Sequence, residues 1–401
     1  MLIVQKFGGS SVANAERVRN VASIITDTYK QGHDVVVVVS AQGDTTDDLL
    51  AAAKEINPSA SKRELDMLVT AGEQMSASLL AMAIEGMGYP VISLLGWQIG
   101  VKTDSNHGNA RIKKIDTERL NAELNRKNIV ILAGFQGTNK YDDMTTLGRG
   151  GSDTTAVAIA AVLKADSCEI YTDVDGVYTA DPRKVKNAQK LNEITYDEML
   201  ELATLGAQVL HNRSVEMAKK YHVNMEVRSS LERIPGTKVK EVVKMEKTLI
   251  RGVASDKNVA RITMVGVEDT PGVAHKVFSL MAARKINVDI ILQSIGRDGT
   301  KDIVFTVSAD QADETMNALN EITESLGCKS VSCDTDIAKV SIVGAGMESH
   351  PGVASTMFEA LYSANVNIQM ISTSEIKISV LIKKDLAEKA VSAVHAAFFG
   401  E

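Results

Sequence analysis

Hydrophobic residues in the first part of the chain follow two different spacings. Val18, Val21 and Ile25 recur at the spacing of one helix face, and a second helical pattern covers residues 62–84. A continuous run of valines at 35–39 is typical of a parallel strand that is covered on both faces. Further strands are predicted at residues 2–7, 91–95, 129–133, 168–172 and 224–229. This alternation predicts an α/β domain in which a mostly parallel central sheet lies between helix layers.

A second pattern begins after residue 260, where the sequence repeats itself. Pro271-Gly272-Val273-Ala274 recurs 80 residues later as Pro351-Gly352-Val353-Ala354, and Asn287 recurs at the same shift as Asn367. Each copy is predicted to form a strand, a Pro-Gly turn, a helix, two more strands and a final helix. Two copies are too few for a solenoid, so a pair of small α/β modules is expected.

The boundary between these two parts is predicted at residues 231–247, which contain Pro235-Gly236 and several charged side chains. We therefore expect a first domain at 1–230, a linker at 231–247, a first module at 248–335 and a second module at 336–401. The strand expected at 249–254 fits either module.

Composition narrows the class of ligand. The chain has 401 residues, 44% hydrophobic and 24% charged, with a formal net charge of −7. Such a balance gives no net attraction to nucleic acid or to an anionic membrane, so a small-molecule ligand is expected. Three cysteines (Cys168, Cys328 and Cys333) have neither zinc-site spacing nor the even number of a disulfide framework. They indicate a reducing compartment, and since no segment is expected to reach the length of a membrane span, we expect a cytoplasmic protein.

The strongest chemical signal is the glycine-rich stretch at 145–155. Three glycines (Gly148, Gly150 and Gly151) surround Arg149, and the run Ser152-Asp153-Thr154-Thr155 leads into an apolar helical pattern at 156–165. Backbone N–H groups at a helix start, together with a guanidinium group, indicate an anion site. An ordinary glycine-containing turn before a helix explains the same residues equally well.

Other polar segments also follow predicted strands. Lys6 ends the first strand and precedes the turn Gly8-Gly9, a layout that places phosphates at a helix start. A polar loop at 40–47 follows the valine run, at the sheet edge where ligands of open α/β sheets bind. Glu73 lies in an apolar helical stretch, although most helical glutamates face solvent. A long polar loop at 172–183 is either functional or an ordinary surface loop, and the chain has no G-x-x-x-x-G-K-[ST] run of a P-loop NTPase.

With these segments in view, the chain resembles the aspartokinase family over essentially its whole length. The resemblance rests on Lys6-Phe7-Gly8-Gly9-Ser10-Ser11-Val12, on the loop 146–153, on the stretch 171–178 and on the two Pro-Gly-Val modules, which are of the ACT type. It implies an N-terminal amino-acid-kinase fold followed by two ferredoxin-like ACT domains. It also implies ATP-dependent phosphorylation of the L-aspartate β-carboxylate to 4-phospho-L-aspartate, the first step toward lysine, threonine and methionine.

The resemblance also implies roles for individual residues. The catalytic residues would be Lys6, Arg149 and Asp153, with Asp153 orienting Lys6. The residues that bind aspartate would be Ser40, Thr45, Thr46, Glu73, Arg149, Gly150, Gly151 and Ser152. The residues that bind ATP would be Lys6, Phe7, Gly8, Gly9, Thr172, Asp173, Tyr178, Asp181 and Arg183, with Mg²⁺ held by the ATP phosphates rather than by a protein metal site.

Regulation is implied as well, because ACT domains of this family bind amino-acid effectors. Lysine, threonine or both would inhibit the enzyme through two groups of residues. They are Asp269, Ala274, Asn287, Asp289 and Gln293 in the first module, and Val353, Ala354, Asn367, Ile368, Ser374 and Glu375 in the second. The family further implies a homodimer through the ACT domains, or assembly with a shorter regulatory chain.

Two other functions remain open at this point. Another acyl-phosphate-forming kinase of the same fold would act on glutamate or acetylglutamate. A non-catalytic amino-acid sensor would keep an inactive kinase domain, although the presence of Lys6, Glu73, Arg149 and Asp153 argues against it.

Overall fold

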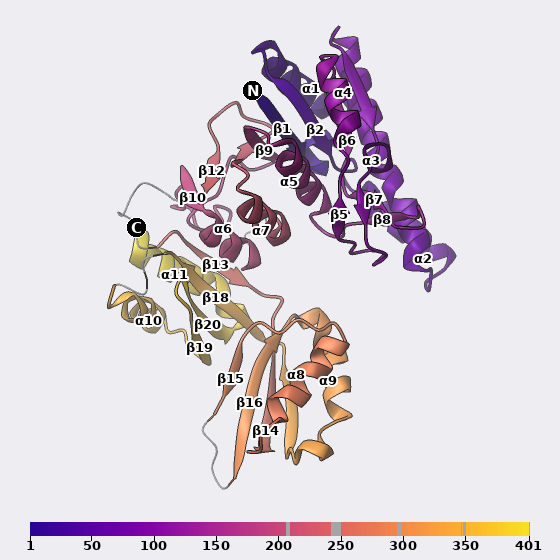
Figure 1. The fold of residues 1–401 in the computed structure, drawn as a ribbon. Helices are drawn as coiled ribbons and strands as arrows, with labels where there is room; N and C mark the ends of the chain where they lie inside the picture. Colours follow the sequence, from indigo (N-terminus) through magenta and orange to yellow (C-terminus); the bar gives the residue numbers. More distant parts are fainter. Residues whose placement is uncertain (206–208, 242–249, 295–298, 346, 348–349, 401) are drawn as a thin grey trace. The chain divides into compact units, whose positions relative to one another are not determined.

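The structure, a computed structural model, describes residues 1–205, 209–241, 250–294, 299–345, 347 and 350–400 (Figure 1). The chain divides into two compact units. The first consists of Met1–Tyr178 and Lys190–Met245, and the second of Thr179–Gln189 and Glu246–Glu401. Each unit is built around its own sheet system and its own core.

The first unit contains an eight-stranded sheet, mostly parallel, with the strand order β10-β12-β11-β9-β1-β2-β6-β3 (Figure 1). Only the β11–β12 pair is antiparallel among these pairings. The strands are β1 (Leu2–Phe7), β2 (Asp34–Val39), β3 (Val91–Leu94), β6 (Ile129–Ala133), β9 (Ser167–Thr172), β10 (Glu193–Thr195), β11 (Met225–Ser229) and β12 (Thr237–Lys240). The predicted parallel α/β sheet is therefore confirmed.

Helices cover both faces of this sheet, which explains the unbroken valine run. All five valines of β2 are fully buried. On one face α1 and α3 pack together over β2 and β6, and on the other face α5 contacts β1, β2 and β9. The helices are α1 (Ala15–Lys30), α2 (Thr45–Ile56), α3 (Lys62–Gly86), α4 (Glu118–Asn125), α5 (Gly151–Leu163), α6 (Tyr196–Thr204) and α7 (Asn212–Tyr221).

A small sheet lies beside the large one and leads into the glycine-rich loop. Its strand order is β5-β4-β7-β8, with β4 (Lys102–Thr103), β5 (Ile112–Lys114), β7 (Gln136–Thr138) and β8 (Met144–Thr146). Because β8 ends at Thr146 and α5 begins at Gly151, only four residues separate the small sheet from the helix that covers the large one. This short connection contains Arg149.

The start of α5 differs from the sequence-based expectation. The run Ser152–Thr155 was expected to precede a helix at 156–165, but the helix begins at Gly151 and ends at Leu163. Gly150 is the N-cap residue, in the left-handed conformation and without a side-chain cap. Glycine is preferred there because it adopts positive φ at little cost. Ser152 and Asp153 therefore lie in the first helical turn.

The expectation that no segment reaches the length of a membrane span is wrong for α3. This helix has 25 residues and is apolar enough to cross a membrane by length and composition. However, 44% of its most apolar window is buried inside the protein, and the buried face carries Asp66 and Glu73. Packing against the core of the first unit accounts for its buried apolar residues Ala77, Leu80 and Ile84.

The second unit contains two four-stranded antiparallel sheets, each with two helices. The first sheet has the order β15-β16-β14-β17, with β14 (Ala260–Glu268), β15 (Ile291–Gln293), β16 (Thr300–Val307) and β17 (Ser330–Asp334). The second has the order β13-β18-β20-β19, with β13 (Gly252–Asp256), β18 (Ile337–Val343), β19 (Met370–Thr373) and β20 (Lys377–Lys383). The helices are α8 (Val273–Ala283), α9 (Ala312–Asn320), α10 (Val353–Ser363) and α11 (Ala387–Phe399).

The two sheets share one spatial arrangement of strands, and this confirms the ferredoxin-like fold. The repeat is visible in the cores, since α8 buries Val273, Val277 and Met281, and α10 buries the residues 80 positions later. The edge strand of the second sheet is β13, which pairs with β18 although it precedes the whole first module in the chain. The first module is thus inserted between β13 and the rest of the second.

A short segment of the chain, Thr179–Gln189, also belongs to the second unit. Ala180 and Val185 are buried in the core of the second module. Thr179 Oγ1 lies 2.8 Å from Nε2 of the buried His395, and the Thr179 carbonyl accepts a hydrogen bond from Val253 N. Residues 179–189 fall inside the range 1–230 expected for the first domain, but their contacts are those of the second module.

Candidate active site

Several predicted site residues line one cavity of about 260 Å³ in the first unit. It lies beyond the carboxyl ends of β1 and β2 and beside the start of α5, where an open α/β sheet binds its ligands. The lining residues are Lys6, Gly8, Gly9, Ser40, Thr46, Glu73, Phe135, Gly148, Arg149, Gly150, Ser152 and Asp153. The cavity therefore gathers both charge signs around a space suited to a small polar molecule.

The ammonium group of Lys6 contacts a carboxylate in the lining of this cavity. Lys6 Nζ lies 2.6 Å from Asp153 Oδ1, and the two side chains are only 13% and 11% exposed. Lys6 stands near the end of β1, and Asp153 stands in the first turn of α5, so two elements of the rigid core set the distance. A partly desolvated, charge-assisted pair of this kind fixes where the ammonium group points.

The lining of the cavity also includes Glu73, a buried carboxylate on α3. Its Oε1 accepts a hydrogen bond from Ala41 N at 3.1 Å, while Oε2 has no hydrogen-bond partner among the described residues. Burial raises the pKa of Glu73 to about 7, and the Ala41 hydrogen bond offsets part of that effect. A buried, half-satisfied carboxylate is costly by itself, and a bound cation would relieve this cost.

Gly72, the neighbour of Glu73 in the sequence, explains how α3 comes so close to the loop that follows β2. A Cβ atom at Gly72 would lie 2.7 Å from the side chain of Ala41, so a larger residue there would push the helix away from the loop that follows β2. The predicted loop 40–47 therefore meets α3 directly. Ser40 and Thr46 come to the cavity from this loop and from the start of α2.

Arg149 is held between two glycines in the left-handed conformation, Gly148 at φ 80° and Gly150 at φ 68°. At Gly150 a Cβ atom would lie 2.3 Å from Cβ and Cγ of His211, so no larger side chain fits without movement. The side chain of Arg149 is exposed at the cavity rim. The first N–H groups of α5 follow directly, as the anion-site prediction requires.

Phe135 is a lining residue that sequence reasoning missed. It adopts a positive φ of 69°, which is rare for a bulky residue, and its N–H donates to Thr155 Oγ1. The position could have been found, because Phe135 follows β6 at the same carboxyl edge as the residues after β1 and β2. Gly148, which belongs to the glycine-rich stretch, is a second lining residue outside the predicted set.

Three predicted residues lie beside the cavity rather than in its lining. Thr45 donates a hydrogen bond to Gln42 O at the start of α2, one residue before Thr46. Phe7 is fully buried and stacks on Tyr171 with ring centroids 4.6 Å apart. Gly151 packs against Phe135 and Leu147, where a Cβ atom would be crowded. Each of the three is next in sequence to a residue that does line the cavity.

The predicted nucleotide residues follow β9. Thr172 ends this strand and donates a hydrogen bond to Asp173 at 2.9 Å. Tyr178 donates to Asp175 at 2.7 Å, and burial together with this bond raises the pKa of Tyr178 to about 12. Lys190 completes the cluster at 3.1 Å from Asp175, a contact that the sequence did not indicate.

The two remaining nucleotide candidates, Asp181 and Arg183, lie in the segment Thr179–Gln189, which belongs to the second unit. They form a salt bridge with each other at 2.9 Å. This interaction lowers the pKa of Asp181 below its usual value.

The predicted effector residues lie on corresponding parts of the two ACT modules. Asn287 and Asp289 follow α8, and Asn367 and Ile368 follow α10. Ala274 and the pair Val353-Ala354 stand at the starts of these helices, Gln293 ends β15, and Ser374-Glu375 form the turn between β19 and β20. A cavity of about 370 Å³ is lined by Tyr362, Asn365, Val366, Asn367, Gln369, Lys383 and Leu386, so it includes only Asn367 of the predicted set.

Two of the acidic effector candidates already have basic partners. Asp289 pairs with Nζ of the buried Lys339 at 2.5 Å, which joins the first module to the second, and Asp269 pairs with Lys301 at 2.8 Å. Any effector ammonium group that binds these carboxylates therefore has to compete with a lysine of the protein.

No cluster of three or more His, Cys, Asp or Glu side chains in the described part of the chain could hold a metal ion. The carboxylates around the cavity, Glu73 and Asp153, are instead directed at a backbone N–H group and at Lys6. The donor set of the cavity suits an anionic and ammonium-bearing ligand better than a resident metal ion.

Sequence comparison identifies families for both units. The profile of the amino acid kinase family matches residues 1–229, and ACT domain profiles match residues 261–324 and 340–398. Aspartokinase from Bacillus sp. (strain MGA3) is 52% identical over 99% of this chain and 97% of its own length.

Solved structures give the same result. The structure of E. coli aspartokinase III in complex with aspartate and ADP has a TM-score of 0.86, with 27% identity over 100% of both chains. The structure of the same enzyme in complex with lysine and aspartate has a TM-score of 0.76, with 27% identity over 99% of both chains. From its amino acid kinase fold, its two ACT domains and its full-length relatives, the chain is a kinase that belongs to the aspartokinase family.

Proposed function

We propose that this kinase transfers the γ-phosphoryl group of ATP to the β-carboxylate of L-aspartate, giving 4-phospho-L-aspartate. The observation that carries the proposal is one cavity lined by Glu73, Arg149 and Lys6. An amino acid presents an ammonium and a carboxylate group, and the cavity offers one partner of opposite charge for each. The solved relative that holds aspartate and ADP supports the same substrate pair.

In the proposed complex Glu73 binds the ammonium group of aspartate through Oε2, the oxygen that has no partner among the described residues. Arg149 binds the α-carboxylate, since a guanidinium group can donate two parallel hydrogen bonds to it. Ser40, Thr46, Gly150 and Ser152 then surround the rest of the molecule. This leaves the β-carboxylate as the group directed toward Lys6.

The chemical step needs charge compensation more than proton transfer. The β-carboxylate of aspartate is already ionised near pH 7, so no general base is required. Its approach to the γ-phosphate brings two like charges together, and at about 4 Å they repel by about 4 kcal/mol at an effective dielectric constant of 20. Lys6, held by Asp153, and the first N–H groups of α5 are placed to offset this repulsion.

The nucleotide is proposed to bind with its phosphates beside Gly8 and Gly9. A Cβ atom at Gly9 would lie 2.6 Å from Ala41 O, so this turn has space only for a glycine backbone. Thr172, Asp173 and Tyr178 extend the nucleotide site along the end of β9. Mg²⁺ bound to the ATP phosphates would neutralise part of their charge. We also propose that the protein acts in the cytoplasm, a reducing compartment that suits its three free cysteines.

The decisive test is ADP release measured with aspartate, glutamate and acetylglutamate as separate acceptors. We expect turnover with aspartate at least a hundredfold above the other two. Preference for glutamate or acetylglutamate would identify another kinase of this fold. If no acceptor releases ADP, the chain is a sensor rather than a catalyst. If Lys6→Ala is as active as the parent, Lys6 does not act in the reaction.

We further propose that lysine, threonine or both inhibit the enzyme by binding to the ACT modules, in a homodimer or with a shorter regulatory chain. The solved relative in complex with lysine supports this proposal. Titration of activity with each amino acid, singly and combined, tests it. Inhibition by neither would contradict it, and the mass in solution with and without effector tests the assembly.

A further inference from the structure

Two charged side chains outside the cavity hold the segment that carries Arg149. Two neighbouring stretches, residues 107–110 and 146–149, run beside each other and are called the loop pair below. Ala110 N donates to Thr146 O at 2.8 Å, and a Cβ atom at Gly148 would lie 3.0 Å from Gly108 O. Arg149 is the last residue of the loop pair, so whatever holds the pair also places its guanidinium group.

Asp66 holds the loop pair from the side of α3. This carboxylate is 2% exposed and accepts hydrogen bonds from Gly108 N at 3.0 Å and from Thr146 N at 3.1 Å. Thr146 Oγ1 donates to it at 2.6 Å, and His107 Nδ1 lies 2.9 Å away. Asp66 therefore satisfies the N–H groups of both stretches at once.

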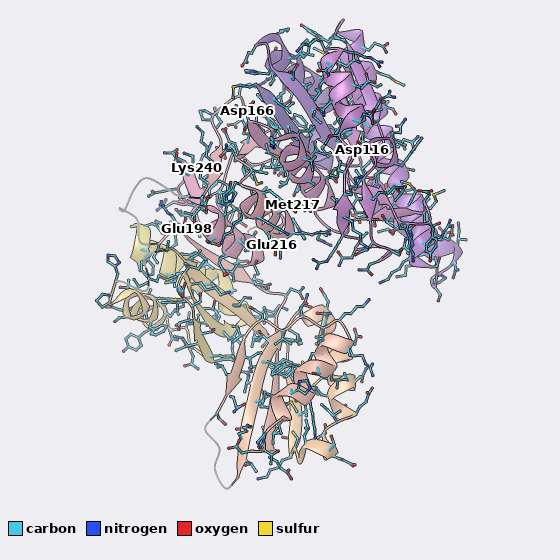
Figure 2. The ribbon with its side chains drawn as sticks, in the orientation of Figure 1. Asp116, Asp166, Glu198, Glu216, Met217 and Lys240 are labelled. Carbon is cyan, nitrogen blue, oxygen red and sulfur yellow. The ribbon has the colours of Figure 1, made fainter. Side chains whose placement is uncertain are left out.

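Arg213 holds the same two stretches from the side of α7, the helix marked by Glu216 and Met217 in Figure 2. Its Nη1 donates to Leu147 O at 2.9 Å and its Nη2 donates to Ala110 O at 2.8 Å. Asp66 thus binds backbone donors of the loop pair and Arg213 binds backbone acceptors. Side chains from two helices of the core therefore bind both the N–H and the carbonyl groups of the loop pair.

The place of Asp66 on its helix links this arrangement to the substrate. Asp66 and Glu73 are seven residues apart on α3, so they lie on the same face of the helix, and both are buried. One helix therefore carries the group proposed to bind the substrate ammonium and also the group that fixes the loop of the α-carboxylate partner. Because Glu73 and Asp66 lie on the same helix, that helix helps to set the distance between the Glu73 carboxylate and the loop that carries Arg149.

We infer that Asp66 and Arg213 are positioning residues for Arg149 and set the affinity of the enzyme for its amino-acid substrate. This inference rests on the proposed function, because it assigns Arg149 to the substrate α-carboxylate. Neither residue lines the cavity, so each acts through the loop pair. A guanidinium group that is misplaced by about 1 Å loses much of its contribution to substrate binding.

The test compares Asp66→Asn, Arg213→Lys and Thr146→Val with Glu123→Gln. Asparagine would turn an amide donor toward backbone donors, and valine removes only the Thr146 hydroxyl. Lysine keeps the charge but has a single nitrogen in place of the two guanidinium nitrogens that reach Leu147 O and Ala110 O. Glu123 is the matched control, since it is 1% exposed and hydrogen-bonded. It lies on α4 and binds Asn128, which precedes β6 at the amino end of that strand, whereas the cavity lies beyond the carboxyl ends of β1 and β2.

We expect KM for aspartate to rise at least tenfold in Asp66→Asn and Arg213→Lys, and severalfold in Thr146→Val, with KM for ATP within twofold of the parent. Thr146→Ser should restore the parent value. Amide exchange at 146–150 should also accelerate in Asp66→Asn, with or without substrate. Glu123→Gln should lower the melting temperature and leave both KM values unchanged.

Unchanged KM for aspartate in the folded variants, or equal increases in both KM values, would overturn the inference. If Asp66→Asn does not fold, Thr146→Val and Arg213→Lys decide the question. Failure of the proposed function gives a different result, since the parent would then release no ADP with aspartate. The exchange rates at 146–150 would still show whether Asp66 fixes the loop pair.

Discussion

Lys6 and Asp153 face each other at 2.6 Å, one at the end of β1 and the other in the first turn of α5. Because Asp153 orients an ammonium group proposed to act on the transferred phosphoryl group, Asp153→Asn should lower kcat by about 10²-fold, and Lys6→Met by about 10³-fold. KM for aspartate should change less than threefold. Steady-state kinetics with both substrates measures this.

The control for the ion pair is the exposed contact of Lys127 with Asp34, 3.0 Å long, at the amino end of β2. Lys127→Met should leave kcat within twofold, since exposed ion pairs contribute little. A fall in kcat that is equal in the two lysine variants would show a general effect of lost charge, contrary to a catalytic role for Lys6.

Glu73 predicts a pH dependence whose sign follows from its raised pKa of about 7. Below that pH the carboxyl group becomes protonated and loses its attraction for the substrate ammonium. The value of kcat/KM for aspartate should therefore fall up to tenfold per pH unit below pH 7, and the profile of Glu73→Gln should be flat and low. Glu64→Gln, an exposed change on the same helix, should keep the parent profile.

Ionisation of Glu73 is expected to favour substrate binding but to lower the stability of the fold. Since the folded pKa of Glu73 lies above its ordinary value of 4.5, its contribution to stability is present below pH 4.5 and is lost as the pH rises to about 7. Glu73→Gln should accordingly be more stable than the parent above pH 7, by up to about 3 kcal/mol, and the difference should vanish below pH 4.5. Urea unfolding at several pH values measures it.

Gly150→Ala should damage the active site by crowding, because its Cβ atom would meet His211 at 2.3 Å. Gly88 provides the matched control, since it also has a positive φ but nothing lies within 4 Å of its Cβ position. Both variants lose the conformational freedom of glycine, and Gly150→Ala should cost about 1–3 kcal/mol more in the free energy of unfolding. Equal costs would show that His211 moves aside freely.

Asn367 and Ser374 should affect regulation more than turnover. Both are exposed on the second ACT module, Asn367 in the lining of its cavity and Ser374 in the turn between β19 and β20. Asn367→Ala and Ser374→Ala should raise the inhibitor concentration for half-inhibition at least tenfold and leave uninhibited kcat within twofold. Ser363→Ala, exposed at the end of α10, should change neither. Parallel loss of turnover and inhibition would mean a structural role.

Much of the fold was predictable from local patterns. The valine run became a strand buried on both faces, and the repeat became two modules whose buried helix positions correspond. Thr195 and Glu198 form a capping box at the start of α6, a motif whose spacing can be read in the sequence. These features depend on side chains close together in the sequence, or on a periodicity that a buried face requires.

Other features depend on contacts between distant segments. Helical periodicity could not tell which side of α3 carries Glu73, and this was decided by Gly72 packing against Ala41. No local pattern assigns β13 to the second ACT sheet, or residues 179–189 to its core, because the partners lie far along the chain. Asp66 and Arg213 look like ordinary helical charges in the sequence, and only the loop pair between them reveals their contacts.

The sequence by itself therefore determined the family, the modules and the types of residue at the site, because motif spacing and hydrophobic period are local properties. The tertiary structure decided which of those residues share one cavity and what supports them. The physical reason is that side chains are buried, and backbone groups find their hydrogen-bond partners, by contacts between segments that lie far apart in the sequence. Asp66 on α3 and Arg213 on α7, for example, together hold the loop of Arg149.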